Sequence, residues 1–134
     1  MDSSFSIRSF QAKDFDAILE LNSQEGWEQL AANKDETFHG WINSEPALVL
    51  TNNDEVVGYL RGLTDGSVSL FVCELLIRRD YRGQNLGKIL IEEAHSCYPS
   101  TRVEVLATSE SEGYYSQQSF RPFYGFRKAA EEFV

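Results

Sequence analysis

The chain has 134 residues, 42% of them hydrophobic, and carries a formal net charge of −9 from 12 basic and 21 acidic side chains. This content can fill one core, so we expect a single folded domain over residues 1–134. The net negative charge argues against a protein that binds nucleic acid or anionic membranes, and it favours cationic partners. Neither a membrane-spanning apolar run nor a signal peptide is recognisable, which predicts a cytoplasmic protein.

The first half of the chain alternates short apolar patterns with turn residues. Residues 5–10 predict a short strand, and Asp14 precedes a helical stripe made by Phe15, Ile18, Leu19 and Leu21. A second, weaker helix is predicted over residues 36–43. Three strands then follow in hairpin succession, at residues 46–52, 55–64 and 67–77.

The second half predicts a strand–helix–strand unit. A buried helical stripe marks residues 86–98, and a strand follows at residues 102–107. Such a crossover makes the two strands parallel, so the predicted fold class is α/β with a mixed sheet. After a short helix at residues 109–118, residues 119–133 predict a terminal aromatic strand or hairpin.

A basic, glycine-containing segment joins the predicted strand to the crossover helix. Residues 78–88 hold four of the 12 basic side chains and two glycines, a composition typical of an anion site at a helix start. A Walker loop is excluded, because Lys88 is followed by Ile89 and not by a hydroxyl residue that could bind magnesium. A Rossmann fingerprint is absent as well. The pattern R-x-x-[GA]-x-[GA], however, fits Arg82 to Gly87 except at Asn85.

This segment resembles the pyrophosphate loop of the GNAT acyltransferase superfamily, and the order of predicted elements is similar to the order in that superfamily. The resemblance implies a GNAT-like fold with acetyl-CoA as co-substrate. It implies that three strand residues offer backbone groups to the pantetheine arm, namely Leu75, Leu76 and Ile77. It also implies that amides of the loop surround the pyrophosphate, namely those of Arg82, Gly83, Gln84, Asn85, Leu86, Gly87 and Lys88. Asn85 stands where the family usually has Gly or Ala, but Asn tolerates a left-handed backbone and favours the helix N-cap, so we expect the loop to keep its shape.

The resemblance also implies acetyl transfer to a primary amine, a reaction that needs an acid and a base. Tyr115, of the pair Tyr114-Tyr115, would protonate the departing thiolate, although Ser119 replaces the glycine that the family has after this helix. Glu74 is the first candidate for the base that deprotonates the amine, and Glu104 is the second. A simple structural role for each of these side chains stays open at this point, and no metal site is indicated.

The sequence says less about the acceptor of the acetyl group and about the oligomeric state. Residues 22–42 carry Glu25, Trp27 and further acidic or aromatic side chains, which suit a cationic small-molecule or peptide amine but equally suit a solvated helix face. The aromatic C-terminus makes a homodimer reasonable. A non-catalytic acyl-CoA-binding or regulatory module is the main alternative function, and a domain that binds another phosphate ligand is a third.

Overall fold

A five-stranded mixed sheet, in the order β1-β2-β3-β4-β5, forms the centre of the computed structural model, which describes residues 4–133. Residues 1–3 and 134 lie outside the described residues. Antiparallel pairing joins the first four strands, which are β1 (Phe5–Ser9), β2 (Ala47–Asn52), β3 (Glu55–Thr64) and β4 (Ser69–Ile77). The fifth strand, β5 (Arg102–Val105), runs parallel to β4. The predicted mixed sheet and its parallel unit are confirmed.

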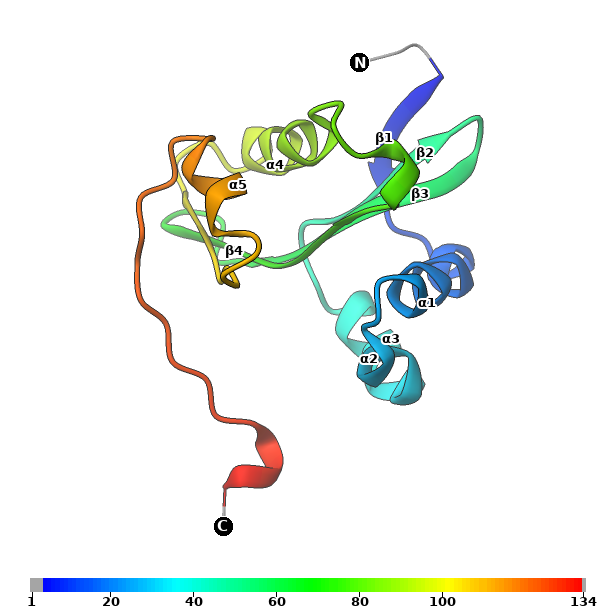
Figure 1. Cartoon of the computed structure of the whole chain (residues 1–134), viewed down its shortest axis with the longest axis horizontal. Coiled ribbons are helices and arrows are strands. Elements are labelled where there is room, and N and C mark those ends of the chain that lie inside the picture. The colour runs from blue at the N-terminus through cyan, green and yellow to red at the C-terminus, as the bar shows by residue number, and fades with distance from the viewer. Residues whose placement is uncertain (1–3, 134) are drawn as a thin grey trace.

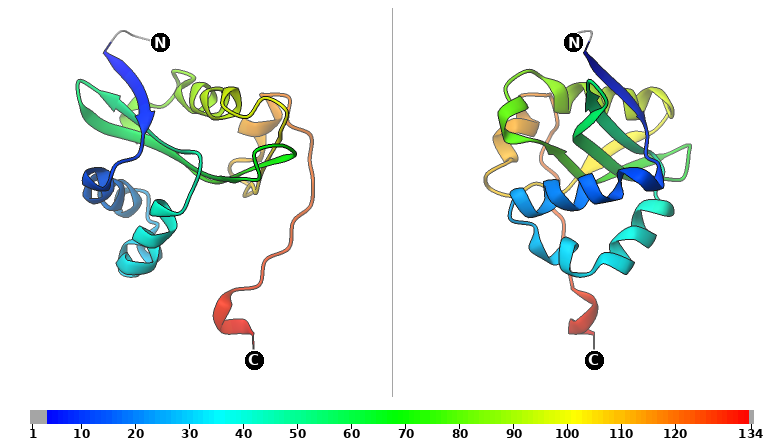
Figure 2. Two further views of the ribbon diagram at one scale, coloured as in Figure 1. Left: turned by 180° about the vertical axis from the view of Figure 1, so that it is seen from behind. Right: turned by 90° about the vertical axis from the view of Figure 1, so that its right-hand side faces the viewer.

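Helices cover both faces of the sheet (Figures 1 and 2). On one face lie α1 (Phe15–Gln24), α2 (Glu28–Ala32) and α3 (Lys34–Ile42), and on the other lie α4 (Leu86–Ser96) and the short α5 (Glu112–Ser116). The sequence patterns anticipated all of these except α2, which has no buried residue and therefore no apolar stripe to detect. Among the described residues, no helix has the length and apolar character needed to cross a membrane.

Strand alternation divides the apolar side chains between two clusters. Leu50 and Leu60 point to the α4 face and pack with Leu90, whereas their neighbours Val49 and Tyr59 point to the α1 face. This is the period of two expected when both faces of a sheet are buried. Since β4 contributes to both clusters, side chains of β4 are presented alternately to the α1 and α4 sides.

A β-bulge in β4 separates this strand into two parts. Gly62 pairs with Val72 but Arg61 pairs with Glu74, so Cys73 is an extra residue with no partner on β3. The pairing of β5 with β4 ends at Val72, directly before the bulge. Because a bulge bends and twists its strand, β4 leaves β5 at this point. Residues 73–77 therefore have an unpaired backbone edge on the β5 side, which we call the open edge.

The expectation of a terminal aromatic strand or hairpin is wrong for this chain by itself. Residues 120–129 form neither strand nor helix, and only a short 3-10 turn, η3 (Ala130–Glu132), follows them. The figures show this segment leaving the domain and running clear of it (Figures 1 and 2). We call residues 120–133 the arm. A strand needs a neighbour for its hydrogen bonds, and among the described residues the arm pairs with no strand.

One buried ion pair ties β1 to the start of α1. Both oxygens of Asp14 accept hydrogen bonds of 2.8 Å from Arg8, and the Gln11 amide donates to the same carboxylate. The Asp14 side chain is 4% exposed. The hydrogen bonds from Arg8, against the opposing effect of burial, hold the pKa of Asp14 below its usual value.

Replacing Arg8 with methionine is expected to lower the free energy of unfolding by about 3 kcal/mol near neutral pH, because a buried carboxylate loses its cation. A lowered folded-state pKa gives stability that is present above the ordinary pKa of about 4 and is lost as the pH falls through the folded-state value. The difference between parent and variant should therefore shrink in acid. Urea unfolding at neutral pH and near pH 3 measures it. Arg102→Met is the control, because it breaks only the exposed pair with Glu104, worth at most about 1 kcal/mol.

Candidate active site

The predicted phosphate loop has the backbone shape that its residues suggested. It follows a short 3-10 helix, η2 (Arg79–Tyr81), and contains two left-handed residues, Gly83 with φ +83° and Asn85 with φ +62°. The expectation that Asn85 keeps the loop shape is confirmed. Asn85 occupies the N-cap position of α4, where its carbonyl accepts the Ile89 amide at 3.1 Å, although its side chain makes no capping hydrogen bond.

The loop presents backbone amides without internal partners. Within the described part of the chain, the amides of residues 83–88 donate no hydrogen bond. These amides surround the N-terminus of α4, the end at which the helix dipole favours an anion. Gly87 in the first turn is buried beside Tyr114, because a Cβ atom there would overlap the hydroxyl group of Tyr114. The arrangement is chemically suited to a phosphate or pyrophosphate.

The open edge of β4 adjoins this anion site. The edge residues Leu75, Leu76 and Ile77 are paired with β3 on one side, and within residues 4–133 they have no strand partner on the β5 side. The side chain of Leu75 approaches within 3.6 Å of the place that a Cβ on Gly87 would occupy, so the edge and the helix start are neighbours. The structure thus brings together the residues predicted for the two parts of one extended ligand.

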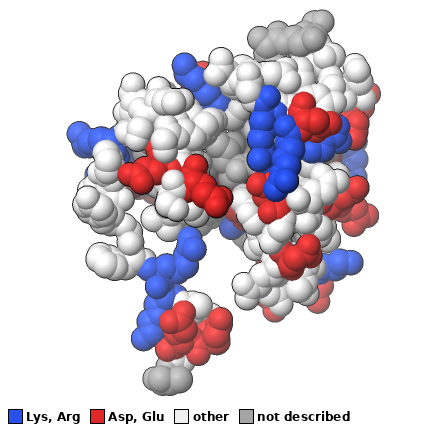
Figure 3. Space-filling model, in the orientation of Figure 1, with Lys and Arg blue, Asp and Glu red and all other residues white. Residues whose placement is uncertain are grey.

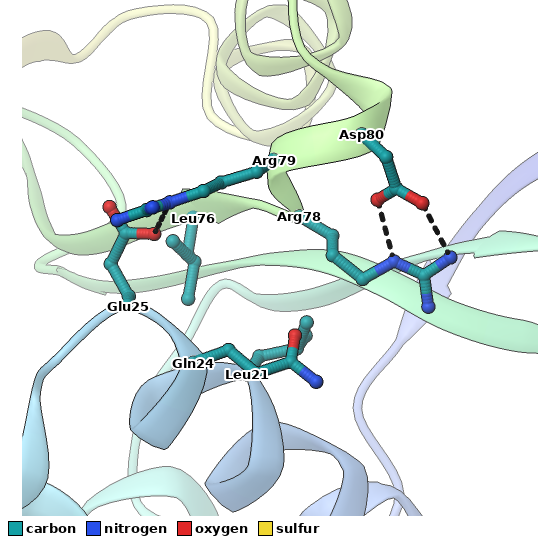
Figure 4. A pocket seen from close by; sticks show the side chains of 7 residues that line it. All are labelled: Leu21, Gln24, Glu25, Leu76, Arg78, Arg79 and Asp80. Atoms are coloured by element: carbon teal, nitrogen blue, oxygen red, sulfur yellow. Dashed lines mark hydrogen bonds and ion pairs between the residues drawn. The ribbon is translucent and has the colours of Figure 1, made fainter.

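A cavity of about 350 Å³ lies on the α1 side of the same strand (Figure 4). The lining residues come from the end of α1, from β4 and from the segment after it, and are Leu21, Gln24, Glu25, Leu76, Arg78, Arg79 and Asp80. This volume is within the range of small-molecule sites. The cavity and the open edge share Leu76, so a ligand in the cavity would lie next to one bound along the edge.

Most of the basic side chains of residues 78–88 form ion pairs with acidic side chains. Glu25 accepts a 2.6 Å hydrogen bond from Arg82 and lies 3.7 Å from Arg79, whose side chain extends to it above Leu76 (Figure 4). Arg78 is paired with Asp80 and Glu55. Arg82 also donates to the carbonyl of Ile77 at 2.8 Å, which fixes the loop to the end of β4. Among the described residues, Lys88 is the basic residue of this segment that has no ion-pair partner.

The family model described as an acetyltransferase (GNAT) domain matches residues 17–134. The chain belongs to the GNAT acetyltransferase family. Members of this family use acetyl-CoA, which agrees with the joined anion site and open edge. No curated protein matches the sequence at a significant level.

Solved structures with low sequence identity share the GNAT fold. A GNAT family acetyltransferase from Streptococcus pneumoniae TIGR4 has 21% identity and a TM-score of 0.76, over 96% of this chain and 98% of its own. The PaiA N-acetyltransferase from Thermoplasma acidophilum, solved in complex with coenzyme A, has 15% identity and a TM-score of 0.69, over 86% and 88%. An Arabidopsis thaliana protein in complex with the bisubstrate analogue CoA-Ac-MVNAL has 15% identity and a TM-score of 0.64, over 88% and 83%. The predicted GNAT-like fold is confirmed.

The two tyrosines of α5 occupy different positions beside this GNAT loop. Tyr115 packs against the apolar cluster under α4, with its ring 5.6 Å from that of Phe120. Burial and the neighbouring Tyr114 raise the pKa of Tyr115 to about 12. Within the described residues its hydroxyl makes no hydrogen bond, whereas the hydroxyl of Tyr114 lies against Gly87. Tyr115 is thus a protonated, unengaged phenol, and Tyr114 covers the helix start.

Glu74 faces the α1 side, opposite to Tyr115 across the strand. Its carboxylate is ion-paired with Arg61, and its second oxygen lies 3.4 Å from the hydroxyl of Tyr59. Tyr59 in turn donates a 2.5 Å hydrogen bond to Asn22 of α1. Because Tyr59 has one hydroxyl proton and gives it to Asn22, Arg61 is the strong partner of Glu74, and the other oxygen of Glu74 has only the long contact with Tyr59. Whether Glu74 is the base stays a prediction.

Glu104 is not brought to the open edge. It lies opposite Phe71 in the paired part of β4 and beside Arg102, at 3.5 Å. Tyr59, Arg61 and Asn22 were not anticipated from the sequence. Their contacts with Glu74 depend on the bulge and on the packing of α1, for which the sequence carries no local signal.

Proposed function

We propose that the protein transfers the acetyl group of acetyl-CoA to a primary amine. The observation that supports this function best is the continuity of two unpaired backbone surfaces. The open edge, at Leu75 to Ile77, matches an extended, amide-containing pantetheine arm, and the free amides of residues 83–88 match a pyrophosphate. Lys88 adds a cation at the same place.

The chain offers one group for each task of the reaction. An amine nitrogen attacks the thioester carbon, and a backbone amide near Leu75 stabilises the negative oxygen that develops. Glu74, directly or through water, takes the proton that the amine loses. When the carbon–sulfur bond breaks, Tyr115 donates its proton to the departing thiolate, for which a phenol that stays protonated at neutral pH is suited.

The decisive experiment is titration of the purified protein with acetyl-CoA, followed by thiol release in the presence of a panel of primary amines. Micromolar binding and amine-dependent thiol release, with the acetylated amine detected by mass spectrometry, would support the proposal. Binding without turnover would favour the non-catalytic alternative. Equal competition by inorganic phosphate or by nucleotides would contradict acetyl-CoA as the ligand.

Glu25 lies between the loop proposed to bind acetyl-CoA and the cavity proposed to bind the amine, and its negative charge favours a cationic amine. It lines the cavity and at the same time neutralises Arg82 of the loop. A pyrophosphate that attracts Arg82 releases Glu25, whose carboxylate can then face a cationic amine in the cavity. Acetyl-CoA would accordingly bind first and prepare the acceptor site.

Glu25→Gln is expected to strengthen acetyl-CoA binding and to weaken amine binding, each by about fivefold, the value of a partly exposed ion pair. Calorimetry gives the first change, and KM for a cationic amine gives the second. Glu20→Gln, on the exposed surface of α1, removes the same charge and should change neither. If Glu25→Gln alters both ligands no more than Glu20→Gln does, Glu25 has no such role.

A further inference from the structure

A fully buried asparagine lies among the apolar side chains between α1 and the sheet. Asn22 of α1 is 0% exposed and follows Leu21, a member of the apolar cluster on the α1 face. The side-chain nitrogen of Asn22 is buried and, among the described residues, has no hydrogen-bond partner. A buried donor without a partner loses its contacts with water and gains none in return, so a leucine at this position would be more stable. A polar side chain at such a position indicates a role beyond packing.

The side-chain oxygen of Asn22 accepts the hydroxyl proton of Tyr59. The two oxygens are 2.5 Å apart, which is in the range of O–H···O hydrogen bonds, and both side chains are fully buried. Burial, and after it the charge of Glu74, raise the pKa of Tyr59 well above its usual value, so the phenol keeps its proton. A phenol has one proton to donate, and this proton is directed at Asn22. The Tyr59 oxygen therefore presents its lone pairs to Glu74, at 3.4 Å.

The direction of the Tyr59 proton decides how one oxygen of Glu74 can react. The other oxygen is ion-paired with Arg61, whereas this one receives no proton from Tyr59. A hydrogen bond donated to a carboxylate stabilises its charged form, so the oxygen that lacks such a bond takes a proton more readily. Once Glu74 has taken a proton, its new O–H group can donate to the lone pairs of Tyr59. The arrangement thus suits Glu74 both before and after it accepts a proton.

The helix that carries Asn22 also lines the cavity proposed for the amine. Leu21 and Glu25 line this cavity from the side of α1, and Leu76 lines it from β4. Glu74 precedes Leu76 by two residues and contacts Tyr59 of the same apolar cluster, so the two side chains lie on one face of the strand. Asn22 itself lines neither the cavity nor the open edge. It can therefore act on Glu74 without contacting either proposed ligand.

We propose that Asn22 is a positioning residue of the reaction: by accepting the hydroxyl proton of Tyr59, it leaves one oxygen of Glu74 free to take the proton of the amine. This inference rests on the acetyl transfer proposed above, with Glu74 as its base. The amine nitrogen forms a bond to the thioester carbon and gives its proton to the free oxygen of Glu74. The carbon–sulfur bond breaks, and the sulfur leaves with the electron pair and takes a proton from Tyr115. The proton on Glu74 is then held toward Tyr59, whose own proton stays on the side of Asn22.

The charged and titratable groups around Glu74 stay the same when Asn22 is replaced. Among the described residues they are Arg61 and Tyr59 of β3, Cys73 beside Glu74 on β4, and Glu25 at the end of α1, whose charge reaches Tyr59. Further Asp and Glu side chains stand at the surface of the face seen in Figure 3, where water and salt screen their charges. A change in the titration of Glu74 on replacing Asn22 therefore reports the redirected hydrogen bond.

Asn22→Leu tests the proposal, because it removes the acceptor and leaves Glu74 as the remaining acceptor beside the Tyr59 hydroxyl. In the full chain without substrates, carrying ¹³C at the glutamate carboxyl carbons, the NMR signal of Glu74 is identified by its loss in Glu74→Gln. This signal should titrate about one pH unit lower in Asn22→Leu than in the parent. In thiol release, kcat/KM for the amine should fall about fivefold, and the acidic limb of its pH profile should move in the same direction.

Two controls separate the hydrogen bond from a general effect on packing. In a Tyr59→Phe background, Asn22→Leu should change neither the titration nor the rate, because no hydroxyl is left to redirect. Thr51→Val replaces another buried polar side chain, which contacts Ser6 of β1, and should leave both values as in the parent. Thermal melting shows that each variant is folded.

The outcomes distinguish this inference from the proposed function. A parent without amine-dependent thiol release contradicts the acetyl transfer, whereas a Glu74 titration that is unchanged in Asn22→Leu overturns the role of Asn22. A titration moved to higher pH overturns it as well. If Asn22→Leu fails to fold, Tyr59→Phe decides, because a rise in the titration of Glu74 in that variant would show that the Tyr59 proton is donated to Glu74 in the parent.

Discussion

Replacing Gly87 with tryptophan is expected to weaken acetyl-CoA binding at least about 100-fold, beyond the range of a simple calorimetric titration. Gly87 lies in the first turn of α4 among the free amides of residues 83–88. A bulky side chain there prevents a pyrophosphate from approaching these amides, and loss of several charge-assisted hydrogen bonds accounts for the magnitude. Because the substituted position already contacts the hydroxyl of Tyr114, some repacking of α5 accompanies the change.

Two controls separate blocked binding from disturbed packing. Gly113→Trp makes the same substitution in α5, where a Cβ has no neighbour within 4 Å, and should keep the affinity of the parent. The double variant Gly87→Ala, Tyr114→Phe removes the colliding hydroxyl and retains a small side chain at the anion site, so it should be folded and intermediate in affinity. A folded Gly87→Trp variant that binds acetyl-CoA like the parent would place the cofactor elsewhere.

The parts of the site that were predictable from the sequence are those fixed by neighbours in the chain. Residues 55–64 alternate and are bounded by turn residues, and β3 has these bounds. Asn85 was expected to accept a left-handed conformation on the basis of its own chemistry, and it does so. Local backbone preferences thus specify the loop, and the crossover rule specifies its place at the end of β4.

The bulge could not be predicted, because it depends on contacts between distant segments. Continuing the pairing from Thr64 and Leu70 without interruption would put Arg61 opposite Cys73. In the structure Gly62 still pairs with Val72 and donates its amide to the carbonyl of Pro46, and Arg61 is opposite Glu74, one residue further along β4. A single inserted residue therefore decides the partner of the candidate base and also opens the edge of β4.

Two other features could not be predicted, because they depend on contacts between residues that are far apart in the sequence. Glu25 and Arg82 are 57 residues apart, and neither has a local signal for the other. The arm shows the opposite situation: its sequence has the pattern of a strand, but the segment does not form one. Its aromatic residues have strand character, but among the described residues they pair with no strand. The contact between Glu25 and Arg82 is the feature on which the proposed coupling of acetyl-CoA and amine binding rests.

Replacing Tyr115 with phenylalanine is expected to lower kcat by about 100-fold, the usual effect of losing a general acid, with little change in the affinity for acetyl-CoA. The substitution removes one hydroxyl that has no hydrogen-bond partner among residues 4–133, so packing with Phe120 and the α4 cluster is retained. Because the pKa of Tyr115 is about 12, the acid stays protonated across neutral pH. Its deprotonation should therefore cause no decline of kcat below about pH 11.

The paired variant Tyr114→Phe identifies which of the two adjacent phenols acts. Tyr114 contacts the start of α4 through Gly87, so its loss should affect acetyl-CoA binding more than kcat. Steady-state thiol release with a saturating amine gives kcat, and calorimetry gives the affinity for both variants. A reversed result, with kcat lowered by Tyr114→Phe and retained by Tyr115→Phe, would assign the proton donor to Tyr114. Unchanged kcat in both variants would mean that the thiolate leaves without a protein acid, as its ordinary pKa near 8.5 permits.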